Sequence, residues 1–171
     1  MSSDSGDGET PAMQRLYESA MRLALVEARA ALADGEWPYG AVVIAPDGTP
    51  VASGRDRVAT TGDPTRHGEF DAVRAAIAAR GGDLTGCILV STVEPCAMCS
   101  GAAWYAGIAT SVFGLGMREL QSLCAAALEE PFGPVAEIYR PMARRLDAVP
   151  GILRTDCLAL FLGSDADGQR R

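Results

Sequence analysis

Apolar residues recur every three or four positions over about residues 13–33. This interval places the apolar residues on one face of a helix, so we predict a helix over this segment. The Asp-Gly pair that follows is expected to end it. Two largely apolar stretches come later, at residues 39–45 and 87–92, and each has the length of a strand buried on both faces. The chain therefore contains both a segment with the repeat of a helix and segments with the length and apolar character of buried strands.

Turn residues and shorter patterns place the remaining elements. Residues 46–49, Pro-Asp-Gly-Thr, are typical of a hairpin turn that leads into a second strand. A polar stretch with a glycine and a proline is typical of a loop, and helical spacing resumes after it. We predict a strand at 51–53, a loop at 59–65, helices at 67–80 and 96–105, a strand at 111–113, and a mostly helical remainder with breaks at 131–134 and 150–151.

The order of these elements predicts the fold class. Helices and strands alternate after the hairpin, which favours a central mixed sheet covered by helices, a three-layer α/β/α domain. We expect residues 11–171 to form this one domain, since a chain of 171 residues can bury a substantial core. Residues 1–10 are polar and acidic, and we expect a disordered tail that is neither a secretory signal nor a transit peptide.

Charge narrows the range of partners. The net charge of −7 should repel polyanions at long range, so we expect no nucleic-acid partner. The dense basic cluster at Arg140, Arg144 and Arg145 is expected to be a solvated helix face. No apolar stretch approaches the roughly 20 residues that span a bilayer, so we expect no membrane partner.

The five cysteines divide into two groups. Cys96 and Cys99 form a C-x-x-C pair, whereas Cys87, Cys124 and Cys157 have apolar neighbours and are expected to be buried thiols. We expect no disulfide framework and a reducing, cytoplasmic location.

Two short motifs bring metal-binding residue types together: His-Gly-Glu at 67–69 and Pro-Cys-Ala-Met-Cys at 95–99. A catalytic Zn²⁺ takes three imidazole or thiolate ligands and leaves its fourth position to water. Cys96 and Cys99 are three residues apart, so their sulfurs lie on one face of a helical turn. His67, the only histidine of the chain, would be the third ligand. The spacing predicts a zinc site.

Glu69 is not needed as a ligand and is free to move protons. The order H-x-E…P-C-x-x-C resembles the signature of the zinc deaminases of nucleobases. This resemblance implies that Glu69 takes a proton from a zinc-activated water and passes it to a ring nitrogen and then to the departing amine, so that ammonia leaves. The helix that begins at Cys96 supplies partial positive charge, which favours thiolates. Its first backbone N–H groups, at Cys96, are placed to hold the attacking oxygen.

The sequence leaves other interpretations of these residues open. The cysteines could be core thiols, and His67 a hydrogen-bonded residue with no metal. A closed structural zinc site would need a fourth ligand from Cys87 or Cys157, and the chain would then be a zinc-stabilised binding module and not an enzyme.

The stretch from Trp37 to Gly114 resembles the cytidine and deoxycytidylate deaminase superfamily, and within it the branch of guanine deaminases, cytosine deaminases and tRNA adenosine deaminases. H-x-E and P-C-x-x-C carry the resemblance, together with Pro-Tyr-Gly-Ala-Val-Val at 38–43, Asp-Pro-Thr at 63–65 and the block at 93–102. The resemblance implies a five-stranded mixed sheet, zinc held by His67, Cys96 and Cys99, Glu69 as the proton carrier, the backbone at Ala41 as a wall of the base pocket, and a homodimer.

One departure from the family concerns the substrate. The family usually has Asn after the hairpin, where this chain has Asp56. An ionised Asp only accepts hydrogen bonds, so it favours a substrate edge that presents N–H donors, as a guanine-like ring does. The alternative is that Asp56 pairs with Arg55, Arg57 or Arg66.

The remaining comparisons with the family concern residues that pack in the core or that would close over the pocket. Trp104 and Tyr105 stand where the guanine branch has aromatic residues, and they could stack on the base or pack in the core. Gly68 replaces the commoner Ala. Phe161 is expected to close the pocket, since C-terminal helices do so in this branch.

We therefore expect a zinc-dependent hydrolytic deaminase of a free purine-like base, guanine-like, or of another small amino-heterocycle. A tRNA-specific adenosine deaminase and a cytosine deaminase are the alternative enzymes.

Overall fold

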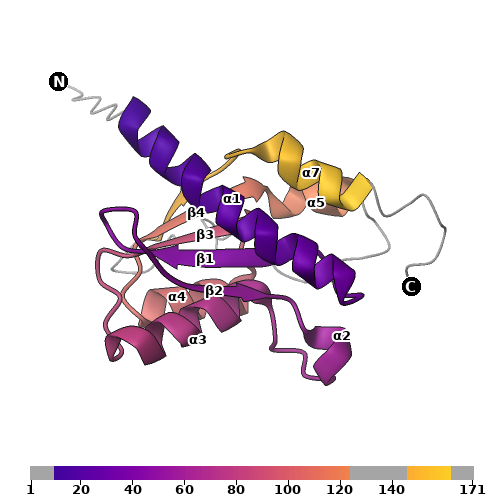
Figure 1. Cartoon of the computed structure of the whole chain (residues 1–171), viewed down its shortest axis with the longest axis horizontal. Helices are drawn as coiled ribbons and strands as arrows, with labels where there is room; N and C mark the ends of the chain where they lie inside the picture. The colour runs from indigo at the N-terminus through magenta and orange to yellow at the C-terminus, as the bar shows by residue number, and fades with distance from the viewer. Residues whose placement is uncertain (1–9, 124–145, 163–171) are drawn as a thin grey trace.

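The computed structural model describes residues 10–123 and 146–162, which form one mixed sheet with helices around it (Figure 1). The five strands of the sheet lie in the order β2-β1-β3-β4-β5. Strand β1 is antiparallel to both β2 and β3, whereas β3, β4 and β5 are parallel. The strands are β1 (Gly40–Ile44), β2 (Pro50–Arg55), β3 (Ile88–Val93), β4 (Thr110–Leu115) and β5 (Asp147–Val149).

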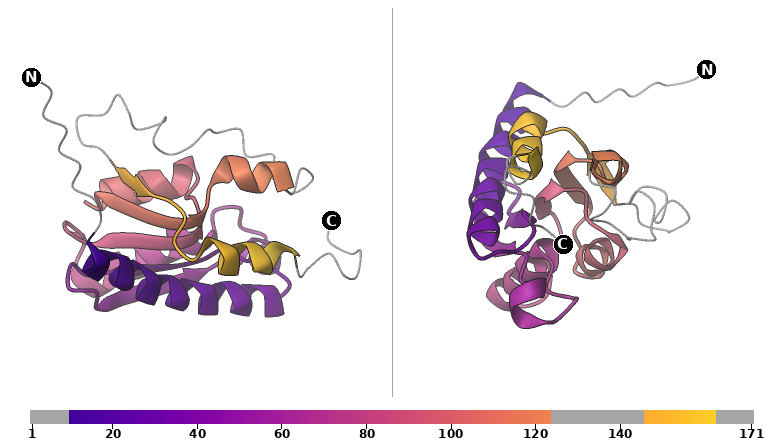
Figure 2. Two further views of the ribbon diagram at one scale, coloured as in Figure 1. Left: turned by 90° about the horizontal axis from the view of Figure 1, so that it is seen from above. Right: turned by 90° about the vertical axis from the view of Figure 1, so that its right-hand side faces the viewer.

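Helices cover both faces of the sheet, which confirms the predicted three-layer fold (Figure 2). One layer contains α1 (Pro11–Ala33) and α7 (Arg154–Leu162), and the opposite layer contains α3 (Gly68–Arg80) and α4 (Ala97–Tyr105). Two short helices, α2 (Val58–Thr61) and α5 (Met117–Leu123), follow β2 and β4. None of the described helices combines the length and the apolar character that a membrane span needs.

The hydrophobic core has two parts, one on each face of the sheet, because side chains alternate between the faces along each strand. Along β1, Val42 and Ile44 pack toward α1 and α7, whereas Ala41 and Val43 pack toward α3 and α4. Successive side chains of a strand point to opposite faces, so a strand between two helical layers is buried on both faces. All five residues of β1 and all six of β3 are buried, as the sequence predicted. The two polar residues of β3, Ser91 and Thr92, donate their hydroxyl hydrogen bonds to backbone carbonyl groups.

Helix α2 overlaps the start of residues 59–65, which the sequence predicted to be a loop. Two buried carboxylates hold this single turn. Glu36 accepts hydrogen bonds from the backbone N–H groups of Ala59 (2.8 Å) and Thr60 (2.6 Å), and Asp56 accepts one from Val58 (3.2 Å). These acceptors satisfy the free N–H groups of a helix start, so the turn depends on a residue more than twenty positions away.

Strand β5 was also missed, because the region after β4 was predicted to be mostly helical. It has three residues and pairs only with β4, where Val112 lies opposite Val149. Such a short edge strand has too few positions to show a strand period. The predicted break at 150–151 is confirmed by Gly151, whose φ is +84°. The predicted tail up to residue 9, the break at 131–134, Cys124 and the Arg140, Arg144 and Arg145 cluster lie outside the described residues.

Two glycines set the distance between α3 and the sheet. A Cβ at Gly54 of β2 would lie 2.3 Å from the Gly68 carbonyl oxygen and 2.5 Å from the Ala72 nitrogen. A Cβ at Gly68 would lie 2.4 Å from the Tyr39 oxygen. The start of α3 therefore rests directly on the backbone of the first two strands.

Candidate metal centre

The starts of α3 and α4 carry all four residues of the predicted zinc site. His67 is the N-cap of α3, and Glu69 lies in its first turn. Cys96 is the N-cap of α4, so Pro95 precedes the cap and does not form the first helical turn, and Cys99 lies in that turn. Both helices lie on the same face of the sheet, so their N-terminal ends meet beside the end of β3.

The three predicted ligands have the spacing of a tetrahedral metal site. The His67 Nδ1 atom lies 3.6 Å from Cys96 Sγ and 3.7 Å from Cys99 Sγ. The ligand atoms of the three residues all lie within 4.8 Å of one another. A tetrahedral zinc with ordinary Zn–S and Zn–N bonds has ligand atoms about 3.5–3.8 Å apart. The donor set and its distances therefore fit zinc.

The two thiols differ in acidity. A hydrogen bond from Cys99, and then one from His67, lowers the pKa of Cys96 to about 4. The pKa of Cys99 is raised well above its usual value, because Cys99 donates to the Cys96 sulfur and is buried. A metal that binds both sulfurs must release the proton of Cys99.

Glu69 is a buried acid beside the ligands. Its Oε2 atom lies 3.8 Å from Cys99 Sγ, and only 5% of the residue is exposed. Burial first, and the nearby charge of Cys96 second, raise the pKa of Glu69 to about 8. A carboxyl with a pKa near neutrality can both accept and donate a proton at physiological pH.

A cavity opens at this point, and four of its seven wall residues were not predicted from the sequence. His67, Glu69 and Cys96 line it together with Tyr39, Val93, Glu94 and Met117. The carboxylate of Glu94 is buried and accepts a hydrogen bond from the Met117 backbone N–H at 2.9 Å. The one sequence signal for Glu94 was its place directly before Pro-Cys, and nothing in the sequence marked Tyr39 or Met117 as wall residues.

Asp56 is 2% exposed, does not line this cavity, and pairs with none of the arginines proposed for it among the described residues. Its Oδ1 atom accepts from Val58, and it lies beside the buried carboxylate of Glu36. Burial raises the pKa of Asp56 to about 6, while Val58 and the nearby charge of His67 act in the opposite direction. The charge of Asp56 in turn raises the pKa of Glu69.

The other predicted substrate residues do not line the cavity. Ala41 is fully buried against α3 and α4, and the wall residue from this part of the chain is Tyr39. Trp104 packs at the far end of α4 and meets Tyr105 edge-to-face at 5.2 Å, and Tyr105 is 86% exposed. Phe161 lies behind the wall, with its ring 6.1 Å from that of Tyr39.

A fourth cysteine ligand is absent from the described residues. Cys87 lies near Arg80, with the guanidinium 3.8 Å from its sulfur, and Cys157 packs on Met21 in the other layer. Neither belongs to the group of His67, Cys96 and Cys99. The closed four-ligand site that a purely structural zinc would need has therefore no support among these residues.

The family model for the cytidine and deoxycytidylate deaminase zinc-binding region matches residues 14–115. The chain is 48% identical over 100 residues to a tRNA(Ile)-lysidine synthase of Deinococcus deserti, a match of 58% of this chain but 19% of that protein. It thus spans about a fifth of that relative. It is 35% identical over 111 residues to a probable cytosine deaminase of Schizosaccharomyces pombe, 65% of this chain and 67% of the relative.

Two further comparisons concern a guanine deaminase and a protein solved in complex with a purine. A guanine deaminase of Bacillus subtilis is 44% identical over 70 residues, which is 40% of this chain and 44% of that protein. The solved complex of the protein NE0047 with 2,6-diaminopurine superposes with a TM-score of 0.79 at 27% identity. That match covers 91% of this chain and 84% of the other.

Proposed function

Because the chain belongs to the cytidine and deoxycytidylate deaminase family, we propose that it is a zinc-dependent hydrolytic deaminase that releases ammonia from a free, guanine-like purine base or another small amino-heterocycle. One observation carries this proposal: His67, Cys96 and Cys99 lie at tetrahedral spacing beside the buried acid Glu69. Three ligands leave a metal position open, as a catalytic zinc requires and a structural zinc does not.

His67, Cys96 and Cys99 would hold the zinc, which supplies the activation of water at neutral pH. Glu69 is the proton carrier. Its carboxylate takes a proton from the attacking water and gives it to the ring nitrogen next to the amino-bearing carbon. After the oxygen has added to that carbon, Glu69 takes the remaining proton of the added hydroxyl and passes it to the amino group. The C–N bond then breaks, so that ammonia leaves and the keto base forms. A pKa of about 8 for Glu69 suits both directions of transfer.

The guanine-like substrate class has two supports. The neighbour NE0047 binds 2,6-diaminopurine, a purine with amino groups. Asp56 stands where the family usually has Asn, and its charge acts on both His67 and Glu69. We propose that Asp56, which does not line the cavity in this structure, accepts hydrogen bonds from N–H donors of the base once the base is bound, because an ionised carboxylate accepts and cannot donate.

A screen of ammonia release tests the proposal directly. Purified, zinc-loaded protein is given guanine, 2,6-diaminopurine, adenine, cytosine, a pterin and an aminotriazine in parallel. We expect turnover on at least one free heterocycle, with amino-purines ahead of cytosine. Inosine formation in a tRNA anticodon loop, faster than release from every free base, would instead support a tRNA adenosine deaminase. No turnover on any substrate by fully zinc-loaded protein would favour a binding module.

A further inference from the structure

A second cavity, of about 510 Å³, lies outside the catalytic machinery, between the outer edge of β2 and helix α3. This volume is within the range of sites for nucleotide-sized ligands. Four arginines line it, Arg55, Arg57, Arg66 and Arg74, against two carboxylates, Glu27 and Asp71. We call these four arginines and the space between them the arginine groove. Its local excess of positive charge contrasts with the net charge of −7 of the whole chain.

Ion pairs hold two of the arginines in place without using all their donors. Arg66 meets Asp71 Oδ2 with Nε at 3.1 Å and Nη2 at 2.8 Å. Arg55 meets Glu27 at 3.6 Å and Asp34 at 3.1 Å through its terminal nitrogens. The Arg55 Nε atom is buried and has no hydrogen-bond partner. A buried donor of this kind is costly unless a ligand or a water satisfies it.

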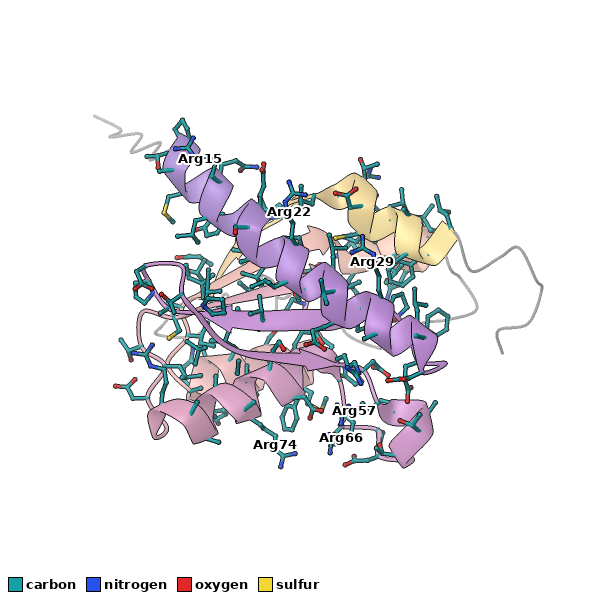
Figure 3. All side chains as sticks on the ribbon, in the orientation of Figure 1. Arg15, Arg22, Arg29, Arg57, Arg66 and Arg74 are labelled. Atoms are coloured by element: carbon teal, nitrogen blue, oxygen red, sulfur yellow. The ribbon has the colours of Figure 1, made fainter. Side chains whose placement is uncertain are left out.

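The other two arginines have no carboxylate partner among the described residues. Arg74 lies over the Phe70 ring at 6.0 Å, and both Arg57 and Arg74 are exposed. Figure 3 shows Arg57, Arg66 and Arg74 together near α2 and α3, apart from Arg15, Arg22 and Arg29, which run along α1. Guanidinium groups that converge on one cavity suit phosphoryl oxygens, which they bind in pairs of parallel hydrogen bonds.

We propose that the arginine groove binds a small phosphorylated ligand of about nucleotide size, with Arg57 and Arg74 as the main phosphate contacts. A long RNA is disfavoured, because the rest of an acidic chain repels a polyanion while a short ligand meets only the groove. The arginine groove is also connected to the candidate metal centre by a backbone hydrogen bond. The Arg57 N–H donates to the Arg66 carbonyl at 2.9 Å, directly before His67.

Calorimetric titrations of the full chain with pyrophosphate, AMP and a 20-nucleotide RNA, at one fixed salt concentration, test the proposal. The variant Arg57→Gln/Arg74→Gln removes the two unpaired charges of the groove. The control Arg15→Gln/Arg22→Gln removes two exposed charges of α1 and leaves the net charge of the variants equal. We expect saturable binding of pyrophosphate and AMP that weakens at least ten-fold in the groove variant and less than two-fold in the control.

Three results would overturn the proposal. Equal weakening in both variants would show diffuse attraction without a site. The absence of saturable binding of pyrophosphate and AMP up to 10 mM would show that the groove holds no phosphate. Binding of the RNA ten-fold tighter than that of pyrophosphate, with loss in the groove variant, would make the groove part of an RNA track. The readout is binding and does not depend on deaminase activity, so it can fail while the proposed function stands.

Discussion

Glu69 combines burial with a pKa near neutrality, and its substitution separates shape from proton transfer. Glu69→Gln should keep the fold and the zinc content but lower kcat at least about a hundred-fold, because the amide has the same shape and cannot carry a proton. Released ammonia measures turnover, and elemental analysis measures zinc per chain. Glu18→Gln, on α1 and outside both cavities, is the control and should stay within a few-fold of the parent. Near-parental activity of Glu69→Gln would mean that another group moves the proton.

The buried carboxyl of Asp56 predicts a pH-dependent stability. Its pKa rises from about 3.8 to about 6 on folding, mainly through burial. The folded state therefore binds more protons than the unfolded state between these values, and the free energy of unfolding falls as the pH rises through them. The variant Asp56→Asn has no ionisable group at this position, so it does not lose this stability as the pH rises. Its stability relative to the parent should improve by on the order of 2–3 kcal/mol between pH 4 and pH 7.5.

Urea unfolding at several pH values checks this expectation for Asp56→Asn. A stability difference that is the same at every pH would show that Asp56 has an ordinary pKa in the folded protein.

The variant Asp56→Asn also tests the proposed contact between Asp56 and the substrate. If Asp56 accepts from the base, kcat/KM on amino-purines should fall roughly ten- to a hundred-fold, since a hydrogen bond to a charged group contributes about 1.5–3 kcal/mol.

At the scale of single residues, the sequence was informative where the chemistry is local. His67, Cys96 and Cys99 come together as predicted, because each lies at the start of a helix and the two cysteines share one turn. The wall residues Tyr39 and Met117 could not be predicted in this way. Each reaches the cavity only because the ends of different strands meet there, which is a property of the sheet and not of any short segment.

At the scale of elements, the long helices and the buried strands were predictable because their patterns are long and regular. Helix α2 and strand β5 were not. Helix α2 depends on Glu36, which reaches it from beyond the end of α1, and β5 depends on the exposed edge of β4. Tertiary contacts decide the structure of such short segments, and they outweigh local propensity.

The close backbone contact between α3 and β2 at Gly54 predicts that a larger residue there destabilises the fold. Gly54→Ala should destabilise the fold by about 1–3 kcal/mol and reduce zinc content, because its Cβ would meet backbone atoms of α3 that cannot rotate away. Gly116→Ala is the matched control, since its Cβ would meet nothing closer than 3.8 Å. Thermal unfolding and zinc per chain measure both effects. Parental stability in Gly54→Ala would mean that α3 can move away from the sheet at little cost.

At the scale of the whole molecule, charge decides how the protein meets large ligands. A net charge of −7 and a local groove of arginines predict weak binding of tRNA, with a Kd of about 10⁻⁴ M or weaker at physiological salt. Fluorescence anisotropy with a labelled anticodon stem-loop, at two salt concentrations, measures it. Micromolar affinity that survives physiological salt would contradict this expectation and would favour RNA as the substrate.

The metal ligands and Glu69 all fall within one continuous stretch, residues 67–99, and His67 and Cys96 are 29 positions apart. The loop that a shared metal would close is short, so its entropic cost is small. Strand β5 and helix α7 contribute no ligand. During synthesis, a chain that has emerged as far as the end of α4 already holds the complete ligand set. Zinc could then be captured while the C-terminal part of the protein is still being made.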